Sequence, residues 1–230
     1  MELLNKEVRE FAKKKFDEEL VNKVTILYFT QEPGRIIIPG SAPTQECMFC
    51  RETRQLYEEV SSLSDKIELE IRDFVADKGT ADDYGIDKIP AAIIMGDEDY
   101  GIRFFGIPSG YEFQSLIEAI VDVSKGSTAL SEKTRQTLET LEGDVRIQVF
   151  VTPTCPYCTV AVRLAHQLAL ESPRISGEMV EATEFPHLGQ KYGVYGVPRT
   201  IMNETVSVDG AVPEDVFLEH VRKAAGTPKN

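Results

Sequence analysis

Four cysteines are the residues of this chain best suited to chemistry, and they form two Cys-x-x-Cys pairs, Cys47 with Cys50 and Cys155 with Cys158. A Cys-x-x-Cys that opens a helix places its first sulfur beside unpaired backbone N–H groups, which favour the thiolate. The second sulfur lies one turn further along the same face, where it can attack a mixed disulfide formed by the first. The pattern therefore predicts that Cys47 and Cys155 are nucleophiles and that Cys50 and Cys158 are resolving thiols.

Two non-catalytic interpretations of the same cysteines stay open at this point. Four thiolates suit a tetrahedral structural zinc site, but Cys155 follows Cys50 by 105 positions, whereas structural zinc pairs usually lie about 15 to 20 residues apart. The second interpretation is a pair of inert structural disulfides, which is uncommon in cytosolic proteins outside hyperthermophiles. Redox chemistry is the preferred interpretation.

The two cysteine pairs belong to an internal repeat. Each cysteine of the second pair follows its counterpart by 108 positions, and Pro198 follows Pro90 by the same number. The segment Tyr84–Pro90 also matches Tyr192–Pro198 at this offset. Unrelated halves would not share both motifs and spacing, so the chain consists of two related units.

The first unit contains a loop insertion. The strand-like segment Val24–Phe29 matches Val145–Phe150 at an offset of 121, so the first unit holds 13 extra residues, within Gln31–Glu46. Such insertions belong in loops. The apolar triplet Ile36–Ile38 of this loop is expected either to be buried locally or to form a flap beside Cys47 that contacts apolar segments of substrates.

Hydrophobic periodicity predicts the same element order in both halves. Each half has a leading helix, from Leu3 to about Glu19 in the first, then a strand, the Cys-x-x-Cys, a helix, a second strand, a short helix, a proline-led hairpin and a closing helix. Apolar residues at helical spacing follow each cysteine pair: Leu56, Val60 and Leu63 in the first half, and Val160, Leu164 and Leu168 in the second. The order predicts an α/β protein with units at residues 1–125 and 126–230.

Composition and charge exclude several classes of function. The chain has 230 residues, with 25 Lys and Arg against 38 Asp and Glu and a net charge of −13. This charge opposes nonspecific binding to nucleic acid and to anionic membranes. The charged residues Glu7, Arg9 and Glu10 are incompatible with a secretion signal, and no apolar run reaches the roughly 18 residues of a membrane span. We therefore expect a cytoplasmic protein.

The motifs carry a family resemblance. Cys155-Pro156-Tyr157-Cys158 resembles the glutaredoxin active-site motif, and Val197-Pro198 resembles the cis-proline site of thioredoxin-fold proteins. Pro198 follows Cys155 by 43 positions, as Pro90 follows Cys47. The tandem arrangement covers nearly the whole chain, and it resembles the glutaredoxin-like protein disulfide oxidoreductases of hyperthermophilic archaea and bacteria.

The resemblance implies two tandem thioredoxin-fold units, each a central mixed four-stranded sheet flanked by helices. It implies dithiol–disulfide exchange on protein substrates, including reduction, oxidation and isomerisation. The redox-active disulfides would be Cys47–Cys50 and Cys155–Cys158, without a bound cofactor or metal. Electrons would come from a thioredoxin-reductase-like flavoprotein.

By the same resemblance Pro90 and Pro198 are cis. The backbone of the preceding residues, Ile89 and Val197, would then pair with an extended substrate chain by strand addition and hold its sulfur near the nucleophile. The ordinary alternative is a proline that merely starts a strand.

The sequence also departs from its relatives. It has no Trp, so the thioredoxin Trp-Cys-Gly-Pro-Cys pattern is absent. Tyr28 and Val149 occupy the strand positions where thioredoxins carry a buried proton-accepting carboxylate, so proton transfer must use another group. No glutathione-binding set accompanies Val197-Pro198. The three histidines are expected on the surface or on helix faces: His166, His187 and His220.

The two cysteine pairs are not expected to be equivalent. Glu46 directly precedes Cys47, whereas the neutral Thr154 precedes Cys155. Because a neighbouring carboxylate opposes thiolate formation, we expect Cys155 to have the lower pKa and to be the principal nucleophile.

Two other functions remain compatible with the residues. One is an electron carrier dedicated to a single partner such as a peroxiredoxin, because the Cys155–Cys158 motif alone does not distinguish it. The other is a non-enzymatic binding or scaffold module whose cysteines only form structural disulfides or hold zinc.

Overall fold

The computed structural model describes residues 3–31 and 47–226. Its helices are α1 (Lys6–Glu19), α2 (Cys50–Ser61), α3 (Lys78–Asp83), α4 (Glu112–Lys125), α5 (Glu132–Glu139), α6 (Cys158–Glu171), α7 (Pro186–Lys191) and α8 (Glu214–Ala225). Its strands are β1 (Val24–Thr30), β2 (Ile67–Asp73), β3 (Ala91–Met95), β4 (Ile102–Phe105), β5 (Val145–Val151), β6 (Ile175–Glu181), β7 (Arg199–Met202) and β8 (Val206–Asp209). None of the helices in these residues is both long and apolar enough to cross a membrane.

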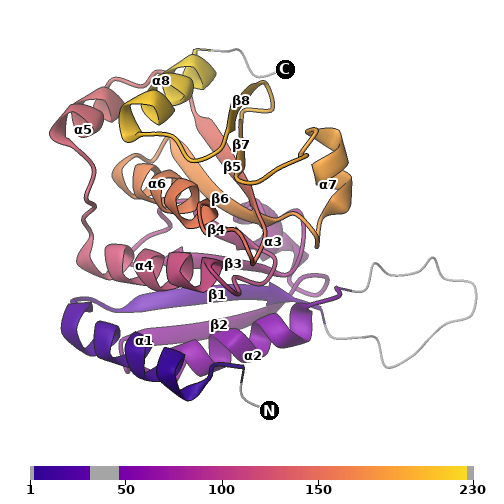
Figure 1. Cartoon of the computed structure of the whole chain (residues 1–230). Helices are drawn as coiled ribbons and strands as arrows, with labels where there is room; N and C mark the ends of the chain where they lie inside the picture. Colours follow the sequence, from indigo (N-terminus) through magenta and orange to yellow (C-terminus); the bar gives the residue numbers. More distant parts are fainter. Residues whose placement is uncertain (1–2, 32–46, 227–230) are drawn as a thin grey trace, which may run out of the picture.

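Each half contributes four strands, and the two sets join into one eight-stranded sheet in the order β2-β1-β3-β4-β6-β5-β7-β8 (Figure 1). The mixed four-stranded arrangement expected of each half is present, since β2, β1 and β4 are parallel to one another and β3 is antiparallel to β1 and β4. The sequence did not predict the junction, in which β4 pairs in parallel with β6.

Two glycines allow the halves to approach closely at this junction. A Cβ atom on Gly101, just before β4, would lie 2.7 Å from the carbonyl oxygen of Ile175. A Cβ atom on Gly177, in β6, would lie 2.5 Å from the carbonyl oxygen of Ala165 in α6. Gly177 N donates to the carbonyl oxygen of Gly101 at 2.9 Å, so the second glycine contacts both the neighbouring strand and the helix above it.

The topology places the ends of β1 and β5 at the same edge of the sheet. All strands except β3 and β7 run in one direction. Three strands, β3, β4 and β6, separate β1 from β5, which corresponds to roughly 19 Å at about 4.8 Å per strand. The cysteine pairs that follow β1 and β5 therefore lie on one edge, about 19 Å apart.

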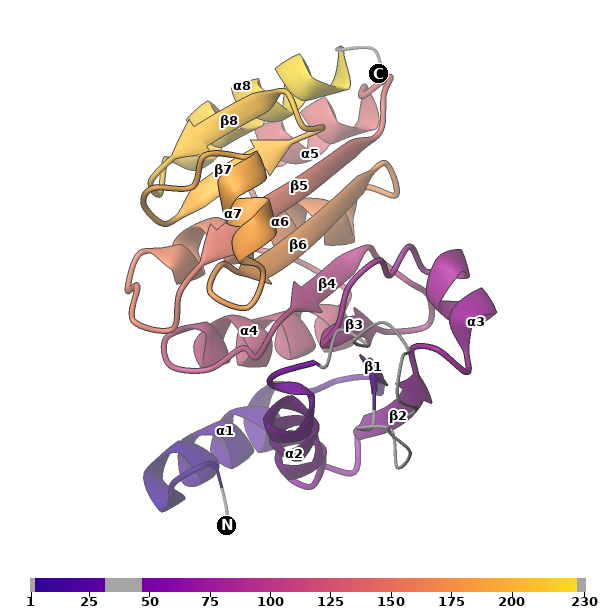
Figure 2. The same ribbon diagram turned by 90° about the vertical axis from the view of Figure 1, so that its right-hand side faces the viewer.

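The two faces of the sheet are covered unequally (Figure 2). The larger core lies under α1, α2, α4, α5, α6 and α8, and the smaller core lies on the other face, near α3 and α7. The apolar face predicted for α6 needs a correction, because Leu164 and Leu168 are buried but Val160 is 55% exposed. Each step of four residues turns about 40° beyond a full helical turn, so Val160 has rotated away from the core.

The leading helix begins later than predicted. α1 starts at Lys6 rather than near Leu3, because Asn5 accepts a hydrogen bond from the backbone N–H of Val8 and forms an N-cap. Its end at Glu19 agrees with the prediction.

Candidate redox site

Both cysteine pairs form disulfides at the start of a helix. Cys47 is bonded to Cys50 with a Cα–Cα distance of 5.4 Å, and Cys155 to Cys158 with 5.5 Å. Cys50 is the first residue of α2, and Cys158 is the first residue of α6. The reduced sulfurs would therefore lie at helix N-termini, where the backbone dipoles stabilise a thiolate.

The first cysteine of each pair is the more accessible one. Cys155 is 8% exposed and Cys158 is fully buried, while Cys47 is half-buried and Cys50 is 3% exposed. The exposed Tyr157 lies between the second pair. This order of exposure suits attack by the first sulfur and resolution by the second.

Two cis peptide bonds lie beside the disulfides. Ile89-Pro90 and Val197-Pro198 are both cis, and they directly precede β3 and β7. Because β3 pairs with β1 and β7 pairs with β5, each cis-proline loop lies next to the strand that leads to its own cysteine pair. The repeat thus brings each predicted loop to the predicted cysteines.

Tyr28 occupies the strand position where thioredoxins carry a carboxylate. Its hydroxyl donates to the carbonyl oxygen of Cys50 at 2.7 Å, and its ring lies 5.2 Å from that of Tyr57. Burial raises the pKa of Tyr28 far above its ordinary value. Tyr28 therefore stays protonated and anchors the start of α2 rather than accepting protons.

A buried acid that the sequence did not reveal is Glu112, at the start of α4. It is 1% exposed, its Oε2 accepts from the hydroxyl of Ser115 at 2.7 Å, and its Oε1 has no hydrogen-bond partner in the described residues. Burial raises the pKa of Glu112 to about 7. An acid in the first turn of a helix is ordinary in sequence, so only its burial distinguishes it.

Glu112 of the first half lies beside the cysteine pair of the second half. Helix α4 runs alongside α6 in the same direction, because Asp122 accepts from Arg163 at 3.3 Å and from Gln167 at 3.1 Å, while Glu118, one turn earlier, pairs with Arg163. Just before α4, Tyr111 N donates to the carbonyl oxygen of Pro153 at 3.0 Å. The first turns of the two helices are therefore level, which puts Glu112 next to Cys158.

Glu184, between β6 and α7, is a second acid with a raised pKa. Its Oε1 accepts from the backbone N–H of Ile107 at 2.6 Å. Burial, with a smaller contribution from the charge of Glu181, raises the pKa of Glu184 to about 7. Glu184 thus contacts the first half at the sheet junction, between the two disulfides.

The histidines differ in their surroundings. His166 lies on a helix face, as expected, but it is only 3% exposed and packs 4.8 Å from the ring of Phe104. Burial lowers the pKa of His166 to about 4, so the ring is neutral at pH 7. His187 and His220 are exposed, in agreement with the prediction.

Neither Glu46 nor the 13-residue insertion can be assessed, because residues 32–46 lie outside the described residues. Among residues 3–31 and 47–226, no cluster of three or more His, Cys, Asp or Glu side chains could hold a metal ion. Each of the four cysteines is bonded within its own pair, which is the arrangement that the redox interpretation requires.

Comparison with known proteins places this geometry. A family model described as a thioredoxin domain matches residues 145–223. A protein disulfide oxidoreductase from Aeropyrum pernix K1 has a similar structure over 98% of this chain and 97% of its own, with a TM-score of 0.86 and 29% identity.

This is a tandem thioredoxin-fold protein. A structure of the alkylhydroperoxide reductase AhpF of Enterococcus faecalis also matches 94% of the tandem thioredoxin-fold chain and 98% of that chain, with a TM-score of 0.82 and 26% identity. The resemblance to protein disulfide oxidoreductases noted from the motifs is thus confirmed by structure.

Curated relatives add a further observation on length. The AhpF component of the alkyl hydroperoxide reductase of Xanthomonas campestris pv. phaseoli is 28% identical over 153 residues, and an NADH dehydrogenase of Bacillus subtilis is 24% identical over 148 residues. These matches cover 66% and 64% of this chain. The chain spans 27% of the length of either relative. Together with the paired disulfides, the fold and the relatives support thiol–disulfide redox activity.

Proposed function

We propose that this protein is a dithiol–disulfide oxidoreductase that acts on protein disulfides through both cysteine pairs. The observation that supports this best is the repeated geometry, in which a disulfide at a helix start lies beside a cis-proline loop at the same edge of the sheet. The units 1–125 and 126–230 each carry one such site.

The reaction proceeds in two exchanges. The thiolate of Cys155 attacks one sulfur of a substrate disulfide, which forms a mixed disulfide and releases the other substrate sulfur as a thiolate that takes up a proton. Cys158 then loses its proton and attacks the sulfur of Cys155. The Cys155–Cys158 disulfide forms, the substrate leaves with two thiols, and two electrons have passed to it. Cys47 and Cys50 take the same roles in the first unit.

Glu112 serves the second exchange. Cys158 is fully buried and must lose a proton before it attacks, and Oε1 of Glu112, which has no partner in the described residues, lies at the same level of the adjoining helix. A pKa of about 7 suits an acceptor that releases its proton again in each cycle.

Substrates bind at the cis-proline loops. The backbones of Val197 and Ile89, which precede Pro198 and Pro90, pair with an extended segment of the substrate and hold its disulfide near the nucleophile. Re-reduction of both pairs by a thioredoxin-reductase-like flavoprotein completes the cycle. Thiols that cycle in this way suit a reducing compartment such as the cytoplasm.

A second candidate function is electron delivery to a single partner, such as a peroxiredoxin. The relatives named alkyl hydroperoxide reductase favour it. A dedicated carrier would reduce one partner rapidly and insulin slowly, so the breadth of substrates separates the two candidates.

The test is reduction of insulin disulfides by the wild type, Cys155→Ser, Cys47→Ser and the double variant. Each is assayed with dithiothreitol, and again with NADPH and a thioredoxin reductase. We expect Cys155→Ser to lose most of the activity, Cys47→Ser to retain most of it, and the double variant to match the uncatalysed rate. If the wild type also matches the uncatalysed rate with both reductants, the proposal is wrong.

A further inference from the structure

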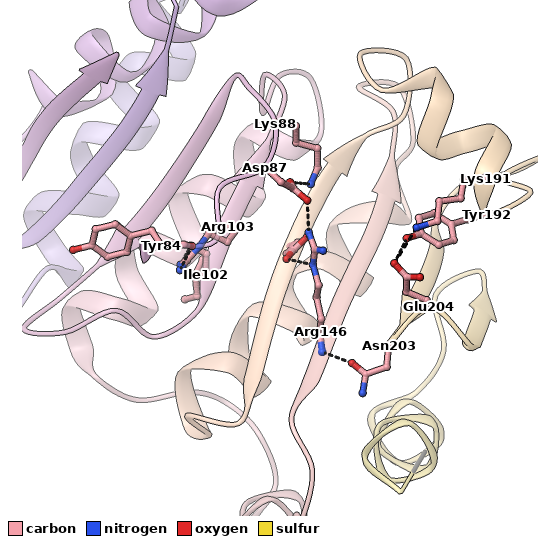
Figure 3. A network of polar contacts seen from close by, with 11 residues as sticks. Tyr84, Asp87, Lys88, Ile102, Arg103, Arg146, Lys191, Tyr192, Asn203 and Glu204 are labelled. Atoms are coloured by element: carbon pink, nitrogen blue, oxygen red, sulfur yellow. Dashed lines mark hydrogen bonds and ion pairs between the residues drawn. The ribbon is translucent and has the colours of Figure 1, made fainter. Parts of the chain in front are cut away.

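The loop that precedes Pro90 in the first unit is fastened to the second unit. Asp87 Oδ2 lies 3.5 Å from Nη2 of Arg146, which is in β5. Arg146 also binds Glu178 of β6 through both carboxylate oxygens, with Nε–Oε1 at 2.6 Å and Nη2–Oε2 at 3.0 Å. Figure 3 shows the side chain of Asp87 turned toward Arg146. A residue three positions before Pro90 is thus tied to two strands of the other unit.

Lys88, the next residue of the loop, is buried against the same network. Its Nζ donates to Oδ1 of Asp87 at 2.6 Å and lies 3.6 Å from the centre of the Phe105 ring. The Lys88 side chain is only 10% exposed, and that of Glu178 is 6% exposed. A lysine held over an aromatic face and paired with a carboxylate has little freedom to move, so two consecutive loop residues are fixed.

The four charges of this network balance. Asp87 and Glu178 supply two negative charges, and Lys88 and Arg146 supply two positive ones. Burial lowers the pKa of Lys88, which the charges of Glu178 and Asp87 counteract. For Asp87 burial is overcome by the charges of Lys88 and Arg146, and its pKa is lowered. Loss of Arg146 would leave the buried carboxylate of Glu178 without its bidentate partner.

The matching loop of the second unit shows no such fastening within residues 3–31 and 47–226. Tyr195 and Gly196 occupy the positions that correspond to Asp87 and Lys88. Tyr195 is fully exposed. Arg199, close to that loop, contacts Tyr192 O and Asp209 of its own unit. The repeat has therefore diverged at these positions, and it is the first loop that is held from across the junction.

We propose that Arg146 is a positioning residue for the Cys47 site, which holds the Ile89-Pro90 loop in the conformation that binds substrate. This inference rests on the proposed function of that loop. It means that the second unit controls substrate binding at the first site without contacting Cys47 or Cys50.

The test separates the two sites before Arg146 is changed. A chain with Cys155→Ser and Cys158→Ser retains only the first site, and a chain with Cys47→Ser and Cys50→Ser retains only the second. Arg146→Met is introduced into each. Arg174→Met is the matched control, because Arg174 pairs with Asp144 at 3.3 Å on the surface of the same unit.

Two readouts are compared for each variant. The first is kcat/KM for reduction of insulin by dithiothreitol. The second is the rate at which iodoacetamide alkylates the reduced cysteine, which requires the thiolate but not the substrate-binding loop. Asp87→Asn is a milder variant that removes one link while Arg146 and Glu178 stay paired, and Arg146→Lys tests rescue by a single positive charge.

We expect Arg146→Met to lower kcat/KM at the first site by about tenfold, mainly through KM. Asp87→Asn is expected to act in the same direction but less strongly, and Arg146→Lys to recover part of the loss. The alkylation rate of Cys47, the activity of the second site and both Arg174→Met chains should stay within twofold of their parents.

Three results would overturn the inference. Unchanged first-site kinetics in both Arg146→Met and Asp87→Asn would show that the network does not position the loop. Equal losses at both sites, or an equal loss in alkylation, would show general destabilisation instead. If the parent chain with only the first site fails to exceed the uncatalysed rate, the proposed function of that site fails, and the positioning role falls with it.

Discussion

At the scale of single residues, the carboxyl group of Glu112 has the least usual environment near the second cysteine pair. One oxygen accepts from Ser115 and the other has no partner in the described part of the chain. An unpaired buried carboxylate is costly, which explains the pKa of about 7. Burial that is unfavourable for stability is common where a group must exchange protons.

Removal of this acid should slow the second site. In a chain that retains only Cys155 and Cys158, Glu112→Gln should lower kcat by roughly tenfold or more at pH 8. The rise in rate through about pH 7 that reflects ionisation of Glu112 should also disappear. Glu184→Gln is the matched control, because its raised pKa is similar but it binds Ile107 N. An unchanged pH profile in Glu112→Gln would remove Glu112 from the mechanism.

The same residue predicts a dependence of stability on pH. The pKa of Glu112 is raised on folding from 4.5 to about 7, so the folded state holds this proton more tightly than the unfolded state does. Stability should therefore fall as the pH rises from about 4.5 to 7 and then level off. Glu112→Gln should unfold at a higher urea concentration than the wild type at pH 8, by at most about 3 kcal/mol, and equally at pH 4. A wild type that is the more stable at pH 8 would contradict this.

The two nucleophiles should also differ in acidity. Cys155 precedes a helix and follows the neutral Thr154, whereas Cys47 follows Glu46. Alkylation of the fully reduced protein by iodoacetamide, followed by peptide mass spectrometry across a pH series, should label Cys155 at a lower pH than Cys47. The opposite order would make the first site the principal one.

At the scale of elements, close packing of β6 under α6 positions the second cysteine pair. Gly177 lies directly below the backbone of α6, and Cys158 begins that helix. The carboxylate of Asp122 ties α4 to the same helix through Gln167. The position of Cys158 relative to Glu112 thus depends on one strand and two helices from both halves.

A methyl group at Gly177 should disturb this packing. Its Cβ would lie 2.5 Å from the carbonyl oxygen of Ala165, so Gly177→Ala should lower the free energy of unfolding by about 1 to 3 kcal/mol in urea. Gly189→Ala is the control, because nothing lies within 4 Å of its Cβ position in α7, and it should stabilise by about 0.5 to 1 kcal/mol. Equal urea midpoints for the two variants would show that α6 adjusts freely.

At the scale of the whole molecule, the continuous sheet separates the two disulfides while it aligns them on one edge. Cysteines that form a disulfide have Cα atoms about 4.4 to 6.8 Å apart. The three intervening strands place the two sites roughly 19 Å apart. A single chain therefore cannot bring Cys47 and Cys155 into direct contact while the sheet is intact.

Exchange of electrons between the sites should accordingly need a second molecule. In a Cys50→Ser, Cys158→Ser chain, mild oxidation should give no Cys47–Cys155 bond within a monomer. Dimers linked through these cysteines should instead increase with protein concentration, as non-reducing electrophoresis and mass spectrometry would show. A monomer with an internal Cys47–Cys155 bond at micromolar concentration would contradict the rigid separation.

The sequence by itself determined the redox chemistry and the element order. The offset of 108 related the cysteine pairs and the two prolines, and helical and alternating patterns placed the elements around them. These features could be predicted because Cys-x-x-Cys reactivity, helix capping and strand alternation all depend on residues a few positions apart.

Only the tertiary structure decided how the halves meet. The pairing of β4 with β6, the position of Glu112 beside Cys158 and the contact of Arg146 with Asp87 join residues from different units. A repeat shows that two halves are alike, but it contains no information about which edges or helix faces join. Burial of His166 and exposure of Val160 follow from the same junction and from helix rotation. Contacts between the units set proton transfer and loop position, and they exist only once the sheet is complete.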